Sequence, residues 1–315
     1  MNDIQQPHVS VLLDEVLAHL LPEGRSIQRA IDGTLGAGGH TLAFLEQGVD
    51  EVLAFDLDPV ALKLGRERVA DYAGRAHLVH SSYENMVEVA HERGWQSVDA
   101  ILLDLGVSSM QLDMPERGFA FRFENSPLDM RFNPQDNRPT AADLVNTWDA
   151  SELADIFYRY GEEQNSRRLA AAIVHDRVEK PFVTTRDLAG LIERITPRRY
   201  DDRIHPATRV FQALRIAVND ELGVIAEVLP KAISLLKSGG RLAVISFHSL
   251  EDRIVKDAFR LASTDCICPP QIPVCRCGHT ASVRLVNKKP IIAGEAEIAS
   301  NPRSRSAKLR IVEKL

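Results

Sequence analysis

One glycine-rich segment has the residue types and spacing to bind a nucleoside-containing ligand. It runs from Asp32 to His40, DGTLGAGGH, directly after a short apolar run. Glycines at such a junction let the backbone turn sharply and approach a ligand closely. Asp56 ends the next apolar run about 20 residues beyond Gly36, the spacing at which an acid can accept both ribose hydroxyls of an adenosine. The pattern therefore predicts an adenosine site.

A second acid, Asp104, ends a later apolar run and is followed by Leu105 and Gly106. We expect these strand ends to lie on one edge of a parallel sheet, where open α/β folds bind ligands. Two other interpretations remain open. A glycine cluster alone also suits an ordinary strand-to-helix turn, and the same edge suits the nicotinamide dinucleotide of an oxidoreductase. The spacing G-x-G-G, rather than G-x-G-x-x-G, argues against the dinucleotide.

The elements that must position these residues follow from hydrophobic periodicity. Short apolar runs predict five buried parallel strands, at 29–32, 52–56, 77–80, 100–104 and 241–247. Helical patterns at 42–47, 59–72 and 83–93 separate the first four strands. Strands that alternate with helices predict an α/β fold with a doubly wound, Rossmann-like sheet. Runs at 282–287 and 308–313 are expected to add antiparallel strands to it.

The alternation stops after Asp104, and helical patterns follow at 140–146, 151–160, 165–179 and 185–195. Thr140 and Ser151 are the expected N-caps of the first two. A helix at 218–236 and a turn at Gly239–Gly240 then lead into the fifth strand. We predict one domain made of residues 1–109 and 216–315, and an all-helical insertion, residues 110–215, that recognises the substrate.

Composition restricts the class of protein. The 315 residues carry a net charge of −6 and a pI near 6.0, so any RNA binding must come from local patches. Residues 195–215 carry five Arg and two Asp, and residues 276–315 carry nine Lys or Arg and three Glu. The polar N-terminus predicts no secretory signal, and no apolar run suits a membrane span. We expect a cytoplasmic protein and leave its oligomeric state open.

Four cysteines, the chain's full complement, lie together as Cys266-x-Cys268 and Cys275-x-Cys277 in a Pro-rich stretch. Such clustering does not suit a disulfide framework spread over a fold. Four thiolates could bind a structural zinc ion, although structural sites more often have two residues between paired ligands. The alternative is four reduced thiols in a loop. Either way the cysteines are structural candidates, and we assign no metal to the predicted adenosine site.

Several segments together resemble a known family over almost the whole chain and in the same order. They are HVSVLLDE (8–15), DGTLGAGGH (32–40), LDLGVSS (103–109) with QLD (111–113), RGF (117–119), PLDMR (127–131), YGE (160–162), HPATRVFQ (205–212) and SFHSLEDR (246–253). The chain resembles the ribosomal RNA small-subunit methyltransferase H family, also called MraW. The resemblance implies a Rossmann-like class I methyltransferase sheet with an inserted all-helical domain.

The resemblance further implies a function and a set of site residues. It implies S-adenosylmethionine-dependent N4-methylation of a cytidine in 16S ribosomal RNA, near the P site of the small subunit. The family's cofactor contacts fall on Gly38, Gly39, His40, Asp56, Tyr83, Asp104 and Gln111. The glycine turn and His40 would face the methionyl end, Asp56 the ribose and Tyr83 the adenine. Asp104 would face the sulfonium and amino groups, and Gln111 would close the site.

Three residues are candidates for accepting the proton from N4. Methyl transfer from a sulfonium is an in-line displacement, and an oxygen acceptor near the amino group can take the proton after transfer. DNA amino-methyltransferases place Asp/Asn/Ser-Pro-Pro-aromatic after the fourth strand, whereas this chain has Asp104-Leu-Gly-Val-Ser-Ser109. Asp104 is the first catalytic candidate, followed by Ser246 and His248. A non-catalytic RNA-binding factor on the same fold is a further alternative.

Overall fold

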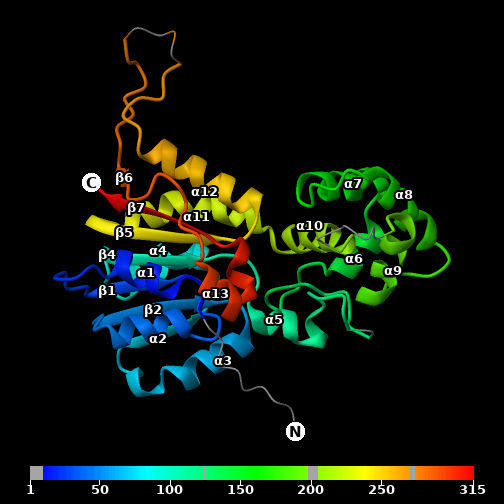
Figure 1. Ribbon diagram of the computed structural model, residues 1–315, viewed down its shortest axis with the longest axis horizontal. Helices are drawn as coiled ribbons and strands as arrows, with labels where there is room; N and C mark the ends of the chain where they lie inside the picture. The colour runs from blue at the N-terminus through cyan, green and yellow to red at the C-terminus, as the bar shows by residue number, and fades with distance from the viewer. Residues whose placement is uncertain (1–9, 124, 198–204, 270, 272–273) are drawn as a thin grey trace. The chain divides into compact units, whose positions relative to one another are not determined.

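The computed structural model describes residues 10–123, 125–197, 205–269, 271 and 274–315. The chain divides into two compact units (Figure 1). Met1–Gly106 and Leu222–Leu315 form the first, here called the sheet unit, and Val107–Glu221 forms the second, the helical unit. Arg198, Arg199 and Arg203, which contribute to the basic segment at 195–215, lie outside the described residues.

The sheet unit is built on seven strands in the order β3-β2-β1-β4-β5-β7-β6. The strands are β1 Arg29–Asp32, β2 Glu51–Asp56, β3 Ala76–His80, β4 Val98–Asp104, β5 Leu236–Ser246, β6 Val283–Leu285 and β7 Lys308–Lys314. The first five strands run parallel, and β7 pairs antiparallel with both β5 and β6. The predicted α/β sheet and its two late antiparallel strands are therefore confirmed.

Helices cover both faces of this sheet. They are α1 Leu13–Leu20, α2 Gly39–Glu46, α3 Pro59–Arg68, α4 Met86–Glu92, α11 Glu221–Leu235, α12 Ser249–Ala262 and α13 Glu295–Ser300. Neighbouring strand residues belong to different apolar clusters: Ile101 and Leu103 pack with residues of α4, α11 and α12, whereas Ala100 and Leu102 pack with residues of α1 and α2. This alternation is that of a sheet buried on both faces.

The structure corrects several boundaries in the sheet unit. The helix expected at 59–72 ends at Arg68, and the one expected at 83–93 begins with a 3₁₀ turn, Tyr83–Asn85. The turn expected at Gly239–Gly240 is wrong, because β5 runs through both glycines from Leu236. The pairing of β4 with β5 shifts register between Val98 and Ala100, and Gly239 has a φ of +75°. The glycines therefore allow an irregularity inside the strand.

The helical unit contains α5 Ser109–Asp113, α6 Ala141–Thr147, α7 Ala150–Arg159, α8 Ser166–Asp176, α9 Thr185–Ile195 and α10 Ala207–Asn219. Its core buries Phe157, Leu188 and Leu214 among other apolar residues. The Thr140 cap is confirmed by a capping box with Asp143. The Ser151 cap is wrong, because Asp149 caps α7 by accepting hydrogen bonds from the backbone amides of Ser151 and Glu152.

The helix expected at 218–236 begins at Glu221 as α11, because residues 218–219 belong to the preceding helix, α10. α10, which the sequence interpretation missed, ends at Asn219, and Asp220 adopts the left-handed conformation with a φ of 51° before α11 begins.

No helix in the described part of the chain is long and apolar enough to cross a membrane.

Candidate functional site

The turn between β1 and α2 is fixed by hydroxyl and carboxylate side chains. Asp32, fully buried at the end of β1, accepts hydrogen bonds from the Thr34 amide at 3.1 Å and from the Thr41 hydroxyl at 2.6 Å. The Thr34 hydroxyl accepts a hydrogen bond from the Asp104 amide at 2.7 Å. The glycine turn is thus tied to the end of β4, next to which a ligand would sit.

Glycine is required in this turn for two physical reasons. Gly36 and Gly38 have φ values of 52° and 79°, which L side chains rarely adopt. At Gly39 a Cβ atom would lie 2.1 Å from the Ser10 hydroxyl oxygen, and at Gly33 it would lie 3.2 Å from the Tyr83 Cβ. The turn therefore packs too closely for side chains.

Asp56, at the end of β2, accepts a hydrogen bond from a backbone amide of this turn. Its Oδ2 accepts a hydrogen bond from the Gly36 amide at 2.8 Å, and its Oδ1 accepts one from the Asp58 amide at 2.9 Å. Burial raises the pKa of Asp56 to about 7, against the lowering effect of these two amides. Each carboxylate oxygen has a second lone pair, so ribose hydroxyls can still donate to it.

His40 and Asp104 face one another across the site. His40 is buried, and its Nε2 lies 3.1 Å from the Val11 carbonyl oxygen, which can only accept, so Nε2 carries the proton. Burial lowers the pKa of His40 and keeps the ring neutral, although the charge of Asp32 opposes this. The unprotonated Nδ1 then lies 3.9 Å from Asp104 Oδ2. Both atoms can accept a hydrogen bond, so a donor group of a ligand could bind to His40 Nδ1 and Asp104 Oδ2 together.

Asp104 has unused hydrogen-bonding capacity. Its Oδ1 is buried and has no hydrogen-bond partner among the residues that the structure describes. Burial raises the pKa of Asp104 well above its usual value, and the charges of Asp32 and Glu251 raise it further. A buried acceptor without a donor is costly unless a ligand supplies one.

The remaining predicted residues lie in different places. Tyr83 begins the 3₁₀ turn after β3 and is half-buried beside Gly33. Gln111 belongs to the helical unit, where it forms a capping box with Ser108 at the start of α5. Its contact with a cofactor stays a prediction.

The two weaker proton-acceptor candidates have structural contacts of their own. Ser246 Oγ donates to the Lys308 carbonyl at 3.4 Å. His248 caps α12, and Glu251, fully buried, accepts hydrogen bonds from the Phe247 and His248 amides at 2.7 and 3.3 Å. Both candidates help to shape the turn after β5, so neither needs a chemical role to explain its position.

The site therefore suits a ligand that is positively charged near Asp104. Asp32, Asp56 and Asp104 end three neighbouring strands, and the charge of Asp32 adds to burial in raising the pKa values of Asp56 and Asp104. S-adenosylmethionine carries a sulfonium and an ammonium, whereas a nicotinamide dinucleotide carries two phosphates that the carboxylates would repel. The residues present fit S-adenosylmethionine.

The strand order, with antiparallel β7 between β5 and β6, and the glycine turn at the end of β1 define a Rossmann-like class I methyltransferase. The family is more specific. The chain belongs to the MraW methylase family, whose model matches residues 5–315. It is thus a methyltransferase that uses S-adenosylmethionine, which confirms the predicted cofactor and excludes the nicotinamide oxidoreductase.

Relatives match over nearly the full length. A protein of Geobacter sp. (strain M21) named "Ribosomal RNA small subunit methyltransferase H" is 49% identical over 98% of both chains. A protein of the same name from Thermomicrobium roseum is 48% identical over 100% of this chain and 95% of its own. The solved structure of an rRNA methylase from Streptococcus thermophilus is a distant likeness, with 13% identity and a TM-score of 0.40 over 96% of this chain and 92% of that one.

Sequence reasoning missed the residues that hold the site together. In the sequence, Asp32 and Thr34 stand out only as members of the glycine-rich segment 32–40, and Thr41 is not included in it, yet the hydrogen bonds of these three residues fix the turn and join it to β4. The available signal was an acid at a strand end followed closely by two hydroxyl residues. That pattern is too common to identify a positioning network without the fold.

The raised pKa of Asp56 predicts a pH-dependent cofactor affinity. If ribose hydroxyls donate to the ionised carboxylate, the dissociation constant for S-adenosylmethionine should fall as the pH rises toward about 7, by up to about tenfold per pH unit. Calorimetric titration between about pH 5 and 7 measures it, below the α-amino pKa of about 7.7–8.0.

Two variants test this assignment. Asp56→Ala should raise the dissociation constant at least about tenfold, since each hydrogen bond to a charged group contributes ~1.5–3 kcal/mol. Asp56→Asn should flatten the pH dependence. The exposed Asp257 on α12 supplies the matched control, Asp257→Asn. An unchanged affinity and pH profile in both Asp56 variants would remove Asp56 from the site.

Proposed function

We propose that this protein methylates N4 of a cytidine in 16S ribosomal RNA of the small ribosomal subunit, in the cytoplasm. This proposal rests mainly on sequence identity. The chain is 48–49% identical, over almost its full length, to proteins named ribosomal RNA small subunit methyltransferase H. The resemblance of the motifs at 103–109, 205–212 and 246–253 to that family supports it. The site residues proposed for the cofactor are Gly38, Gly39, His40, Asp56, Tyr83, Asp104 and Gln111.

The chemistry assigns a task to Asp104. The lone pair of cytosine N4 is delocalised into the ring, so the amino group is a poor nucleophile until an acceptor draws on its N–H bonds. When bound, S-adenosylmethionine supplies a methyl group already activated on a sulfonium. Asp104, whose Oδ1 has no hydrogen-bond partner in the described part of the chain and whose pKa is raised by burial, would accept the N4 proton, because a carboxylate with a raised pKa has a higher proton affinity.

We assign recognition of the RNA to the helical unit and to exposed cations of the sheet unit. Much of the basic segment at 276–315 is neutralised internally: Arg310 and Lys308 pair with Asp252, and Arg284 pairs with Glu313. Lys288, Lys289 and Arg305 are exposed and have no ion-pair partner in the described ranges. A target cytidine must also leave its stack to reach a site beside the sheet.

Lys288 and Lys289 are expected to contact phosphates. Replacing both with Ala should weaken RNA binding and reduce the slope of log K against log salt by about 2, while cofactor affinity stays the same. The charge-matched control is Lys63→Ala with Arg66→Ala, exposed on α3 near the other edge of the sheet. Equal salt slopes for the two double variants would exclude this site from docking.

The function itself is tested by incubating the protein with labelled S-adenosylmethionine and unmodified small subunits, followed by nucleoside analysis of the RNA. N4-methylcytidine should be the labelled product. The folded subunit should also be a far better substrate than a short oligonucleotide of the same sequence. A cytidine in a short single strand is already accessible, and an enzyme that acted on it would not need a helical unit to recognise folded RNA. Label in another nucleoside, or no label at all, would overturn the proposal.

A further inference from the structure

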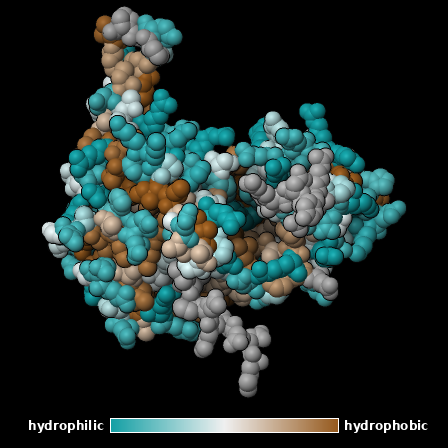
Figure 2. Space-filling view, in the orientation of Figure 1, coloured by the Kyte–Doolittle hydropathy of each residue, from teal (hydrophilic) through white to brown (hydrophobic). Residues whose placement is uncertain are grey.

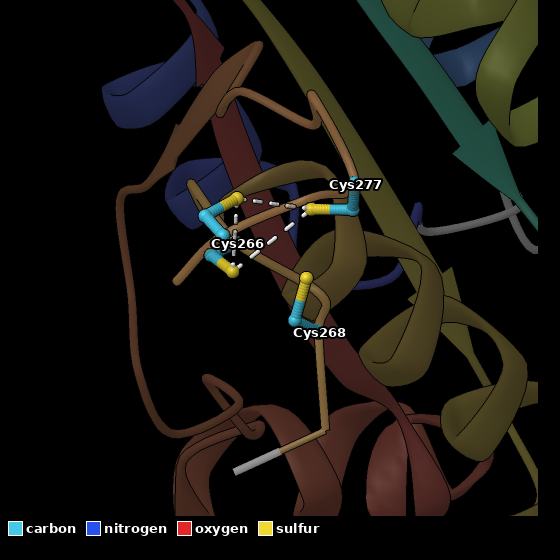
Figure 3. A group of neighbouring side chains, drawn as sticks. Cys266, Cys268 and Cys277 are labelled. Carbon is cyan, nitrogen blue, oxygen red and sulfur yellow. Dashed lines mark hydrogen bonds between the residues drawn. The ribbon is translucent and has the colours of Figure 1, made fainter. Parts of the chain in front are cut away.

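The cysteines lie in an extension of the sheet unit that the methyltransferase site does not use. It is residues 263–282, between the end of α12 and the start of β6, and it projects from the sheet unit (Figure 2). The four thiol sulfur atoms all lie within 4.8 Å of one another. Figure 3 shows the labelled sulfurs of Cys266, Cys268 and Cys277 turned toward a common point.

The sulfurs of Cys266, Cys275 and Cys277 lie at distances close to those of a tetrahedral metal site, and the Cys268 sulfur lies within 4.8 Å of each of them. The Cys266 and Cys275 sulfurs are 3.4 Å apart, those of Cys275 and Cys277 3.5 Å, and those of Cys277 and Cys266 3.9 Å. A zinc–sulfur bond is about 2.3 Å, so the sulfurs around one zinc ion lie about 3.8 Å apart. A disulfide would need about 2.0 Å, and all four cysteines are free thiols.

Backbone amides support thiolate ligands at this point. The Ile267 amide donates to Cys277 Sγ at 3.5 Å, and the Arg276 amide donates to Cys268 Sγ at 3.4 Å. Each C-x-C pair thus receives one amide from the other half of the extension. Such hydrogen bonds orient metal ligands and partly offset the negative charge that four thiolates would bring together.

The described residues of the extension form few other stabilising contacts beyond its base. Its base is closed by hydrogen bonds from the Ser282 amide to Ala262 O, from the Ala281 amide to Asp265 Oδ1, and between His279 and Leu261 O. Beyond this base Ile267 is 50% and Val274 67% exposed, so neither contributes to a core. A small peptide segment without a core usually depends on a cross-link or a metal ion.

We propose that Cys266, Cys268, Cys275 and Cys277 bind one zinc ion that holds the extension in its fold. The ion takes four thiolates and releases their protons to solvent, which leaves no open position for substrate, so the site is structural and closed. Tetrahedral sulfur ligation also suits iron. Because three of the four cysteines are exposed, redox-inert zinc is the better match to a solvent-accessible site.

Elemental analysis of the full-length protein, purified under reducing conditions, tests the proposal directly. One zinc ion per chain is expected, and reconstitution of the metal-free protein with cobalt should give the absorption of tetrahedral cobalt with sulfur-to-metal charge-transfer bands. Iron as the native metal, two disulfide bonds by mass spectrometry, or failure of the reduced protein to take up zinc would each overturn the proposal.

Variants locate the site. Cys275→Ser with Cys277→Ser should lose at least nine-tenths of the bound zinc, whereas Arg276→Ala should retain it, because only the Arg276 backbone contacts a sulfur. Full zinc retention in the cysteine variant would contradict the assignment. Chelation of zinc from the wild type should speed proteolysis within 263–282 at least tenfold and leave S-adenosylmethionine binding unchanged. An unchanged proteolysis rate would contradict the structural role even if the variants fail to fold.

Discussion

Replacement of Asp104 by Asn is expected to lower the rate of methyl transfer by about 10²–10⁴-fold, the range typical of a lost acid–base or charge contact in the transition state. The substitution preserves the shape of the side chain but removes its charge and its ability to accept a proton at both oxygens. Single-turnover kinetics at saturating S-adenosylmethionine separate this effect from weaker cofactor binding.

The stability of the same variant should move in the opposite direction. Burial raises the pKa of Asp104 well above its usual value, with further contributions from Asp32 and Glu251, so its ionised form is unfavourable in the free protein. For an acid with a raised pKa in the folded state, stability falls as the pH rises above the unfolded value. Asp104→Asn should therefore keep or raise the Tm at neutral pH while activity is lost.

A loss of methyl-transfer rate together with an unchanged or higher Tm distinguishes a functional group from a structural one. The control Asp257→Asn, on the exposed face of α12, should change neither the rate nor the Tm. A pH–rate profile adds a further test, because the Asn variant should lose the ionisation assigned to Asp104. If Asp104→Asn retains wild-type single-turnover rates, the proton acceptor is another group, and Asp104 serves the fold or cofactor binding alone.

The centre of the sheet was predictable because β2, β4 and β5 each contain a continuous apolar run, the pattern of a strand buried on both faces. The helices were less so, for identifiable reasons. α12 begins at Ser249 and its N-cap is His248, a residue type that the usual capping rules do not include. α10 begins at Ala207, and its N-cap residue, Pro206, provides no side-chain hydrogen bond. Local sequence therefore gave no start signal for either helix, although both have strongly amphipathic patterns.

The site shows the same division between local and long-range information. The spacing of Gly36 and Asp56 assigned both residues to one expected adenosine site, and the structure joins them by a hydrogen bond of 2.8 Å that the spacing did not predict. The pairing of His40 with Asp104 depends instead on burial and on the Val11 carbonyl. These contacts arise only once β1 and β4 are adjacent. Likewise, C-x-C spacing left zinc undecided, whereas the convergence of four sulfurs is visible only in three dimensions.

The second large effect is expected at Gly118 in the helical unit, within the RGF segment at 117–119. Gly118 has a φ of +73°, and a Cβ there would lie 2.2 Å from the Pro127 carbonyl oxygen and 2.7 Å from the Asp129 amide nitrogen. Both are backbone atoms held by their neighbours: Leu128 donates to Val183 O at 3.0 Å, and Met130 donates to Arg117 O at 3.1 Å. The loop therefore cannot move away without losing hydrogen bonds.

Gly118→Ala should destabilise the helical unit by at least about 2–4 kcal/mol, from backbone strain and the clash together, and lower its Tm by on the order of 10 °C. Gly190→Ala is the matched control in the same unit: Gly190 lies within α9, its Cβ position is open space, and alanine should stabilise the helix by up to about 1 kcal/mol. Differential scanning calorimetry measures both. If the helical unit recognises the RNA, Gly118→Ala should also lose methyl transfer to the small subunit while S-adenosylmethionine still binds the sheet unit. Equal Tm values for the two variants would contradict this prediction, because they would show that the loop around Pro127 can shift to accommodate the added Cβ atom.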